Sequence, residues 1–264
     1  MAPSRSLRDR VAGQSAMSEV VQAQRQAAQR TPAARFFGVS PLEARVRPAY
    51  RDALGELLVG DILENLGQRW DVLHDLPLDG DILDHLVIGP AGVFAVLAAN
   101  HGEVDVVVDG DTLSAAGALH DDFERAARSA NQVEVILSAA AGSPVAVRGL
   151  VVVVDPKRLT VKSEPGAAAV VSSRDLAKAL DKSASALSGD DVARISDIAD
   201  LVSTWPAADE AVLDTQNLHR EFGVIRVETR SALRRRLVLS VAALGLACIV
   251  TWVTVAVLVS TLVR

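Results

Sequence analysis

The longest hydrophobic stretch of the chain lies near its C-terminal end. Leu237–Val263 comprises 27 consecutive residues without a charged side chain. As an α-helix it would extend about 40 Å, at about 1.5 Å per residue, which exceeds the roughly 30 Å hydrocarbon layer of a bilayer. A core helix of a soluble protein seldom runs so far without a polar face. The pattern therefore predicts one transmembrane helix over residues 237–263.

The hydrophobic spacing in the first half of the chain alternates between the periods of helices and strands. Leucine and isoleucine recur at helical spacing over residues 54–66, and Gly67 follows as a stop signal. The Gly-Pro-Ala-Gly sequence at 89–92 predicts a turn, and the strand-like runs on either side of it predict a hairpin. Short apolar runs typical of strands occur at 70–74, 85–88, 93–98 and 104–108.

The second half of the polar part continues this alternation. Residues 123–139 have helical spacing, and residues 147–154 are almost continuously apolar, as in a buried central strand. A short strand and two helices follow, the first helix capped by Ser172 or Ser173 and the second by Ser188. The order predicts an α/β fold in which helices cover a mixed sheet.

The same patterns divide the chain into four segments. Residues 1–47 are expected to form a basic N-terminal arm, partly helical or disordered, because their apolar spacing is weak. Residues 48–206 are expected to form the α/β domain. Residues 207–236 then form a polar connector that ends in an arginine cluster, and the transmembrane helix over 237–263 is the fourth segment.

Charge is distributed unevenly along the chain, whose formal net charge is −6. Residues 1–51 sum to +6, residues 52–229 to −17 and residues 230–264 to +5. The acidic middle segment would repel phosphate groups, so nucleic acid is not expected as its partner. The single cysteine excludes a disulfide within the chain, and the 50% hydrophobic content excludes wholesale disorder.

Flanking charge predicts the orientation of the membrane segment. Only Arg264 follows the span, whereas four arginines lie just before it: Arg230, Arg234, Arg235 and Arg236. The positive-inside rule then places the N-terminal side in the cytoplasm. We expect a single-pass, tail-anchored membrane protein that contacts lipid through Leu237–Val263 and anionic headgroups through its arginines.

Several strings in the domain resemble the nuclease-related domain (NERD), a mostly bacterial family with a restriction-endonuclease-like fold. The similar strings are GELLVGDIL from Gly55, WDVLHDLPLDGD from Trp70, LDHLVIGPAGVFAV from Leu83 and NHGEV from Asn100. The Asn131-Gln132 pair in the next predicted helix also fits, and the resemblance extends from about Asp52 to Leu180. It implies a mixed sheet flanked by helices, in agreement with the spacing of the apolar residues.

The resemblance also implies where a metal site would lie. In the family, a helix glutamate, a strand aspartate and a D/E-x-K pair on the next strand form the proposed site. The carboxylates would hold Mg²⁺, and the lysine would help to position or deprotonate the attacking water. Glu56 and Asp84 match the two acids, and Gln132 is a further residual candidate. The D/E-x-K positions fall on Leu97 and Ala99, so half of the constellation is missing.

Neighbouring residues offer partial replacements for the missing pair. Glu103, Asp105 or His101 could lean into the gap, because they lie just beyond the same strand. The alignment itself makes a structural prediction, namely that Leu97 and Ala99 line one cleft with the two acids. If Leu97 points into a packed core instead, the alignment is shifted by one residue.

The five histidines share no metal-ligand spacing along the chain. His85 beside Asp84 could be a ligand, but its place in a strand favours a hydrogen-bonded histidine. The His120-Asp121-Asp122 sequence is interpreted as the start of a helix rather than as a site.

Together these observations predict a membrane-anchored cytoplasmic protein whose nuclease-like domain is a pseudoenzyme that acts by binding, as a scaffold or regulator. No cofactor is expected. The acidic surface favours a basic protein as the unidentified partner. The alternative is a DNA endonuclease that uses Mg²⁺ through relocated catalytic residues, and a third hypothesis is a homo-oligomeric structural module.

Overall fold

The structure, a computed structural model, describes residues 6–205 and 214–262. Beyond Val253 it describes the side chain of Val255 only. For the predicted transmembrane segment, the structure therefore gives the backbone up to residue 262 and the side chains up to Val253.

Contacts within the chain define two compact units. The first lies within residues 1–19 and 48–218, and the second lies within residues 20–47 and 219–264. Both sheets belong to the first unit, and most of the apolar C-terminal helix belongs to the second.

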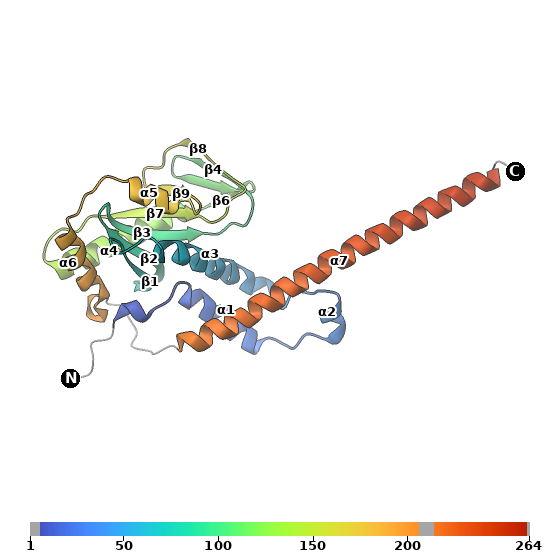
Figure 1. The fold of residues 1–264 in the computed structure, drawn as a ribbon, viewed down its shortest axis with the longest axis horizontal. Helices are drawn as coiled ribbons and strands as arrows, with labels where there is room; N and C mark the ends of the chain where they lie inside the picture. Colours follow the sequence, from blue (N-terminus) through green and yellow to red (C-terminus); the bar gives the residue numbers. More distant parts are fainter. Residues whose placement is uncertain (1–5, 206–213, 263–264) are drawn as a thin grey trace. The chain divides into compact units, whose positions relative to one another are not determined.

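The first sheet has five strands in the order β1-β2-β3-β7-β9 (Figure 1). Strands β1, β2 and β3 are paired antiparallel, whereas β7 and β9 extend the sheet from β3 in parallel. The strands are β1 (Asp71–Leu78), β2 (Asp81–Gly89), β3 (Gly92–Ala99), β7 (Val147–Val153) and β9 (Ala169–Ser172).

Helices cover both faces of this sheet. On one face, α3 (Arg47–Glu64) and α5 (Leu176–Lys182) pack their leucine side chains against β2, β3 and β7. On the other face lie α4 (Asp122–Ala141) and α6 (Gly189–Asp200). Side chains that alternate along a strand are therefore buried on both faces, which explains the nearly continuous apolar sequence of β7.

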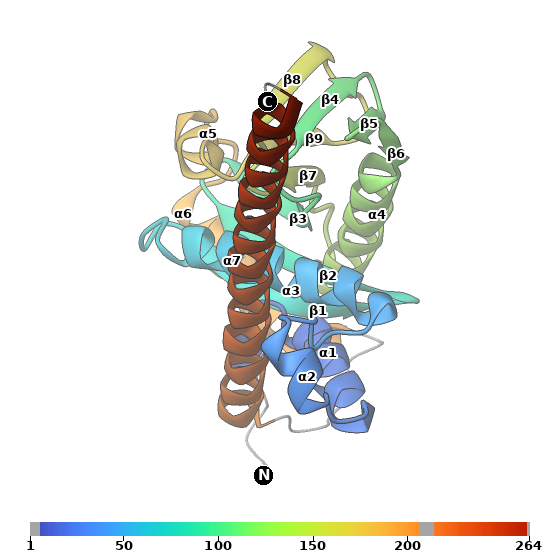
Figure 2. The same ribbon diagram turned by 90° about the vertical axis from the view of Figure 1, so that its right-hand side faces the viewer.

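A second, smaller sheet packs against the C-terminal ends of β3 and β7 and against α4. Figure 2 shows its strands grouped together beside the start of α4. In spatial order they are β6 (Ala118–His120), β5 (Thr112–Ala115), β4 (Asp105–Asp109) and β8 (Arg158–Ser163). Hydrophobic spacing predicts only β4, because β5 and β6 are very short and β8 is mostly polar and exposed.

The predicted fold class is confirmed as a mixed α/β arrangement with flanking helices. Ser188 caps α6 as predicted, by accepting a hydrogen bond from the Asp191 amide at 3.2 Å. The predicted cap of α5 is wrong, because Ser172 is still the last residue of β9. Asp175 occupies the N-cap position instead, and Ser172 Oγ donates to its carboxylate at 2.7 Å.

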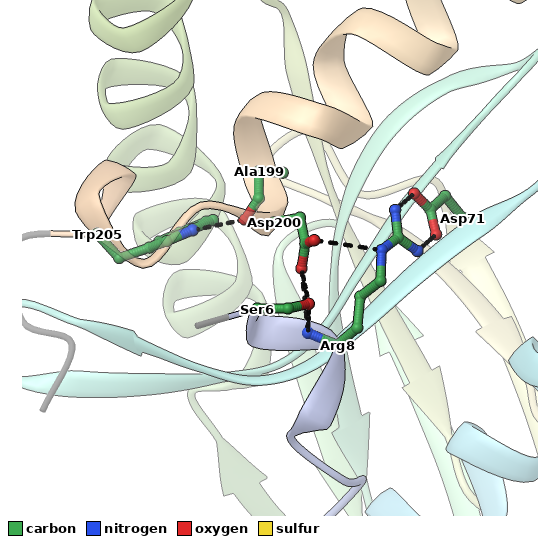
Figure 3. Close-up of polar contacts among 6 residues, drawn as sticks. All are labelled: Ser6, Arg8, Asp71, Ala199, Asp200 and Trp205. Atoms are coloured by element: carbon green, nitrogen blue, oxygen red, sulfur yellow. Dashed lines mark hydrogen bonds and ion pairs between the residues drawn. The ribbon is translucent and has the colours of Figure 1, made fainter. Parts of the chain in front are cut away.

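The beginning of the predicted arm packs on the first unit. Arg8 donates two hydrogen bonds to the Asp71 carboxylate, at 2.5 and 2.6 Å, and Figure 3 shows this paired contact. Ser6 Oγ donates to Asp200 at 2.5 Å (Figure 3). Leu7 is buried in the core cluster shared by the sheet and α6. The segment is therefore held by polar and apolar contacts together.

The second unit is helical. Four elements contribute to it: part of α1 (Gln14–Gln26), α2 (Pro32–Phe36), the 3-10 turn η2 (Ala44–Val46) and most of α7 (Thr215–Leu262). Arg25 pairs with Glu221 at 2.6 Å, and Arg30 pairs with Glu228 at 2.5 Å. Basic residues of the arm thus neutralise acidic residues on the polar part of α7.

α7 begins well before the predicted membrane segment. The part of the predicted polar connector that the structure describes is helical from Thr215 and continuous with the apolar segment. Residues 206–213 lie outside the described residues. Along this polar part, Phe222, Ile225 and Ala232 are buried at helical spacing.

The apolar part of α7 has the properties of a membrane span. In the described parts of the chain, α7 is the one helix long and apolar enough to cross a membrane. Large apolar side chains are exposed along it from Leu237 to Val253, as a lipid-facing surface requires. The arginines that precede it are exposed: Arg230, Arg234, Arg235 and Arg236. This supports the predicted membrane span.

Candidate functional site

Asp84 lies on β2 where the pairing between β2 and β3 ends. The last pair on this side joins His85 and Val96, and the Asp84 carboxylate accepts a hydrogen bond from the Ala98 amide at 2.7 Å. Burial raises the pKa of Asp84 to about 7, while the Ala98 hydrogen bond acts in the opposite direction. Asp84 therefore holds its proton more tightly than an exposed aspartate does.

Glu56 lies on α3 and is also buried. Its pKa is raised well above the ordinary value, first by burial and then by the negative charges of Asp84 and Asp75. The structure thus brings together the two acids selected from the sequence and adds Asp75 of β1 to them. Glu56, Asp75 and Asp84 are called the acid cluster below.

The N-terminal segment packs against the acid cluster. Arg10 forms an ion pair with Asp75 at 2.6 Å, and Ser15 donates to the same carboxylate from its amide and its hydroxyl, at 2.8 and 2.9 Å. Gly13 lies so close to α3 that an added Cβ would be 3.5 Å from Glu56 Cβ. Sequence reasoning missed this contact, because the weak apolar spacing of the arm carries no signal for a partner distant in sequence.

Leu97 and Ala99 lie at the end of β3 in a packed apolar cluster. Their neighbours in this cluster include Phe123 of α4, Val151 of β7 and Val106 of the second sheet. Only 7% of Leu97 and 4% of Ala99 is exposed. Both positions therefore belong to a hydrophobic core, where the resemblance noted in the sequence implies a carboxylate and a lysine.

Leu97 faces away from the side of the sheet that α3 covers. It lies in the apolar cluster with Phe123 of α4, whereas its strand neighbours Val96 and Ala98 pack with the side chains of α3. Asp84 lies beyond the last pair of β2 and β3, so the register of these strands does not assign it to the face of Leu97. Leu97 therefore points into a packed core, which is the outcome expected if the alignment is shifted by one residue.

A shifted alignment does not restore the missing groups. Moving the pair by one residue would place it on Ala98 and Asn100 or on Val96 and Ala98, which include neither a carboxylate nor a lysine. The remaining donors are two buried acids beside a packed N-terminal segment, and Arg10 and Ser15 already hold the third carboxylate, that of Asp75. Mg²⁺ prefers ionised oxygen ligands in octahedral geometry and keeps several waters. The acid cluster does not fit this ion.

A pocket of about 360 Å³ lies at the end of β3, next to the start of α4. Its lining includes Ala99, His101, His120, Asp122 and Arg125. His101 Nε2 and an Asp122 carboxylate oxygen are 2.7 Å apart, and the centres of the His101 and His120 rings are 3.9 Å apart. One ligand atom from each of His101, His120 and Asp122 lies within 4.8 Å of the others. These three residues are called the histidine cluster below.

Sequence reasoning found only part of the histidine cluster. It selected His101 as a residue that could lean toward the gap, and it interpreted His120-Asp121-Asp122 as the start of a helix. Asp121 is indeed the N-cap of α4 and Asp122 its first residue, but Asp122 also contacts His101. The histidines therefore share no metal-ligand spacing along the chain, yet two of them meet in space. Glu103 and Asp105, by contrast, are exposed.

The other two candidates have different partners. Gln132 lines a groove along α4, and its side-chain amide donates to the Asp79 carbonyl at 3.4 Å. His85 and His74 share a hydrogen bond between their Nδ1 atoms at 2.8 Å. Burial, together with His74, lowers the pKa of His85 well below its ordinary value. The favoured interpretation of His85 as a hydrogen-bonded histidine agrees with this contact.

Comparison with protein-family models supports the resemblance noted in the sequence. Residues 51–154 match the model of the nuclease-related domain. The matched stretch runs from α3 to the residue after β7, so it contains both clusters and the end of β3. It stops before Leu180, to which the similar strings were expected to extend. Searches of curated proteins and of solved structures gave no match.

Proposed function

We propose that this chain is a membrane-anchored protein whose nuclease-related domain has lost catalysis and acts by binding, as a scaffold or regulator. The observation that carries the proposal is the packing of Leu97 and Ala99 in an apolar cluster. A metal-dependent nuclease needs ionised carboxylates to hold the metal that activates water and stabilises the phosphate. The acids that remain, Glu56 and Asp84, retain their protons to higher pH than exposed carboxyl groups.

The charge of the domain supports the same proposal. Residues 52–229 sum to −17, whereas a protein that binds nucleic acid presents a basic patch or stripe. Nucleic acid is therefore a poor partner for this domain. Complementary charge attracts and orients binding partners, so a basic protein is the proposed class of partner.

The membrane segment gives the proposed location. Leu237–Val263 would contact lipid, and the four exposed arginines before it place the N-terminal part in the cytoplasm by the positive-inside rule. The protein would then be single-pass and tail-anchored. Protease added to intact cells should remove an epitope fused to the C-terminus. Removal of an epitope at the N-terminus, with the C-terminal one protected, would contradict this orientation.

The central experiment measures DNA cleavage by the full chain in detergent micelles. Wild type, Glu56→Ala and Asp84→Ala are incubated with DNA and either Mg²⁺ or Mn²⁺, after each protein has been shown to unfold cooperatively. No metal-dependent cleavage by any of the three is expected. Cleavage by the wild type that disappears in both folded variants would contradict the loss of catalysis.

A second candidate function is a metal-dependent DNA endonuclease with relocated catalytic residues. The histidine cluster favours it, because it lies in a pocket that Ala99 also lines. Cleavage that survives Glu56→Ala and is lost in His101→Ala would support this second function.

A further inference from the structure

The histidine cluster is assembled from three separate elements of the domain. His101 follows β3, His120 ends β6 and Asp122 begins α4. Asp122 is buried, and only 12% of the His101 side chain is exposed, so both residues are held by packing. The hairpins β4-β5 and β5-β6 return the chain from His101 to His120. The cluster is therefore a product of the second sheet.

We propose that the histidine cluster binds one divalent transition-metal ion, with Zn²⁺ as the best match. Two imidazoles and one carboxylate resemble the ligand sets of open zinc sites, whereas Mg²⁺ and Ca²⁺ prefer oxygen ligands. Neighbouring ligands of a tetrahedral Zn²⁺ lie about 3.4 Å apart, given bonds of about 2.0–2.1 Å. The three side chains supply atoms within 4.8 Å of one another. Small side-chain rotations therefore bring all three into range.

The surroundings favour a cation and leave room for a fourth ligand. The lining of the pocket contains three aspartates and two arginines, so its fixed charges are net negative when the histidines are neutral. A zinc ion with three protein ligands keeps an open position. Water or a small anion can fill that position from the 360 Å³ pocket, with Arg51 and Arg125 on its walls.

This inference goes beyond the proposed function, since zinc binding requires neither DNA cleavage nor its loss. The metal would tie the segment after β3 to the start of α4 and to the second sheet. An experiment that contradicts one of the two proposals therefore leaves the other one untouched. DNA cleavage that depends on Glu56 and Asp84 would leave the zinc site standing, and failure to bind zinc would leave the scaffold function standing.

The test is a titration of the full chain with Co²⁺, followed by Zn²⁺. The protein is made without a polyhistidine tag, kept in detergent micelles and first freed of metal with a chelator. One Co²⁺ per chain should bind with the visible absorption of a four-coordinate ion, and Zn²⁺ should displace it. His120→Ala and Asp122→Asn should each weaken binding by at least about 100-fold, because loss of even an outer hydrogen-bond partner costs about 10–100-fold.

Two variants serve as matched controls. Asp105→Asn changes an exposed aspartate of β4 that lies outside the pocket lining, and His219→Ala removes an exposed histidine of α7. Both should bind Co²⁺ as the wild type does.

The folding of the variants is checked by thermal unfolding without metal. His120 is only partly buried, so His120→Ala should still unfold cooperatively. Asp122→Asn keeps the shape of the side chain. If His120→Ala does not fold, the Co²⁺ affinity of Asp122→Asn alone tests the proposed site. The proposal is overturned if the wild type fails to bind one Co²⁺ per chain, or if folded Asp122→Asn binds it as tightly as the wild type.

Discussion

The acid cluster and the histidine cluster belong to the same domain, but their surroundings differ. Glu56 and Asp84 are buried, and the N-terminal segment packs against the cluster through Gly13 and Arg10. The histidine cluster instead lines a pocket of about 360 Å³. The acids expected from the resemblance are thus covered by the N-terminal segment, whereas the histidine cluster, although Asp122 is itself buried, forms part of the wall of a pocket.

Because of this difference, the two clusters are expected to differ in their affinity for protons and for metal ions. Burial disfavours a charged carboxylate and raises the pKa of both enclosed acids, so a metal ion must compete with a proton for them up to a higher pH than for exposed carboxyl groups. A ligand at the wall of a pocket can exchange water for a metal without moving the backbone. Whether a side chain can bind a metal ion therefore depends on what packs over it as well as on its residue type.

The largest expected effect concerns the contact that encloses the acid cluster. Arg10→Ala removes the ion-pair partner of Asp75, whose side chain is fully buried, and leaves Ser15 as its donor. Breaking a buried ion pair from one side should lower the free energy of unfolding by about 3–5 kcal/mol. Urea unfolding of the full chain in micelles measures this loss.

The control for this prediction is Arg128→Ala, which removes an exposed arginine 3.9 Å from Glu124. The free energy of unfolding should stay close to that of the wild type in this variant. Similar losses in both variants would show that the N-terminal segment does not stabilise the acid cluster.

Leu97→Ala tests whether the end of β3 is a core rather than the wall of a cleft. Removing a leucine side chain from a packed cluster should cost about 2–5 kcal/mol of unfolding free energy. The matched control is Leu119→Ala, because Leu119 is 74% exposed and its truncation should change stability by less than about 0.5 kcal/mol. A small effect at Leu97 would favour an open cleft and hence a site closer to that of the family.

Added Zn²⁺ should distinguish the two clusters directly. At a concentration about 100-fold above the dissociation constant, a ligand that binds only the folded state stabilises it by about 2.7 kcal/mol. Wild type and Glu56→Gln should both gain this stability, whereas Asp122→Asn should not. Loss of the gain in Glu56→Gln, measured by thermal unfolding, would assign the metal to the acid cluster instead.

The last expected effect develops gradually with pH and concerns the proton on Asp84. Because the pKa of Asp84 is raised from 3.8 to about 7 in the folded protein, the folded state binds this proton more tightly than the unfolded state does. Its contribution to stability is present below about pH 4 and is lost as the pH rises toward 7, by up to about 1.4 kcal/mol per pH unit.

Asp84→Asn removes this titration and can still accept the Ala98 hydrogen bond. The variant should therefore gain stability relative to the wild type as the pH rises from 4 to 7. Urea unfolding across this range checks the prediction, and parallel pH profiles for the two proteins would show that Asp84 titrates normally.

The two clusters also differ in how far sequence could predict them. Glu56 and Asp84 stand in local strings that resemble the family, and the resemblance places its D/E-x-K pair on Leu97 and Ala99 within one short stretch. The histidine cluster leaves no such signal, because its members are separated by three short strands of which only β4 has a clear hydrophobic pattern. The α5 cap was mispredicted for a related reason, since several polar residues in a row offer equivalent caps.

Spacing of apolar residues along the chain was enough to establish the α/β fold class, the main helices and strands and the candidate membrane helix. These properties depend on periods of two or 3.6 residues and on the length of an apolar run, and neighbours in sequence carry both. The covering of the acid cluster by Gly13, the second sheet around Leu97 and the meeting of His101 with Asp122 emerged only from the folded arrangement. Each of these joins segments far apart in sequence, and burial, pKa and ligand geometry arise from such long-range contacts.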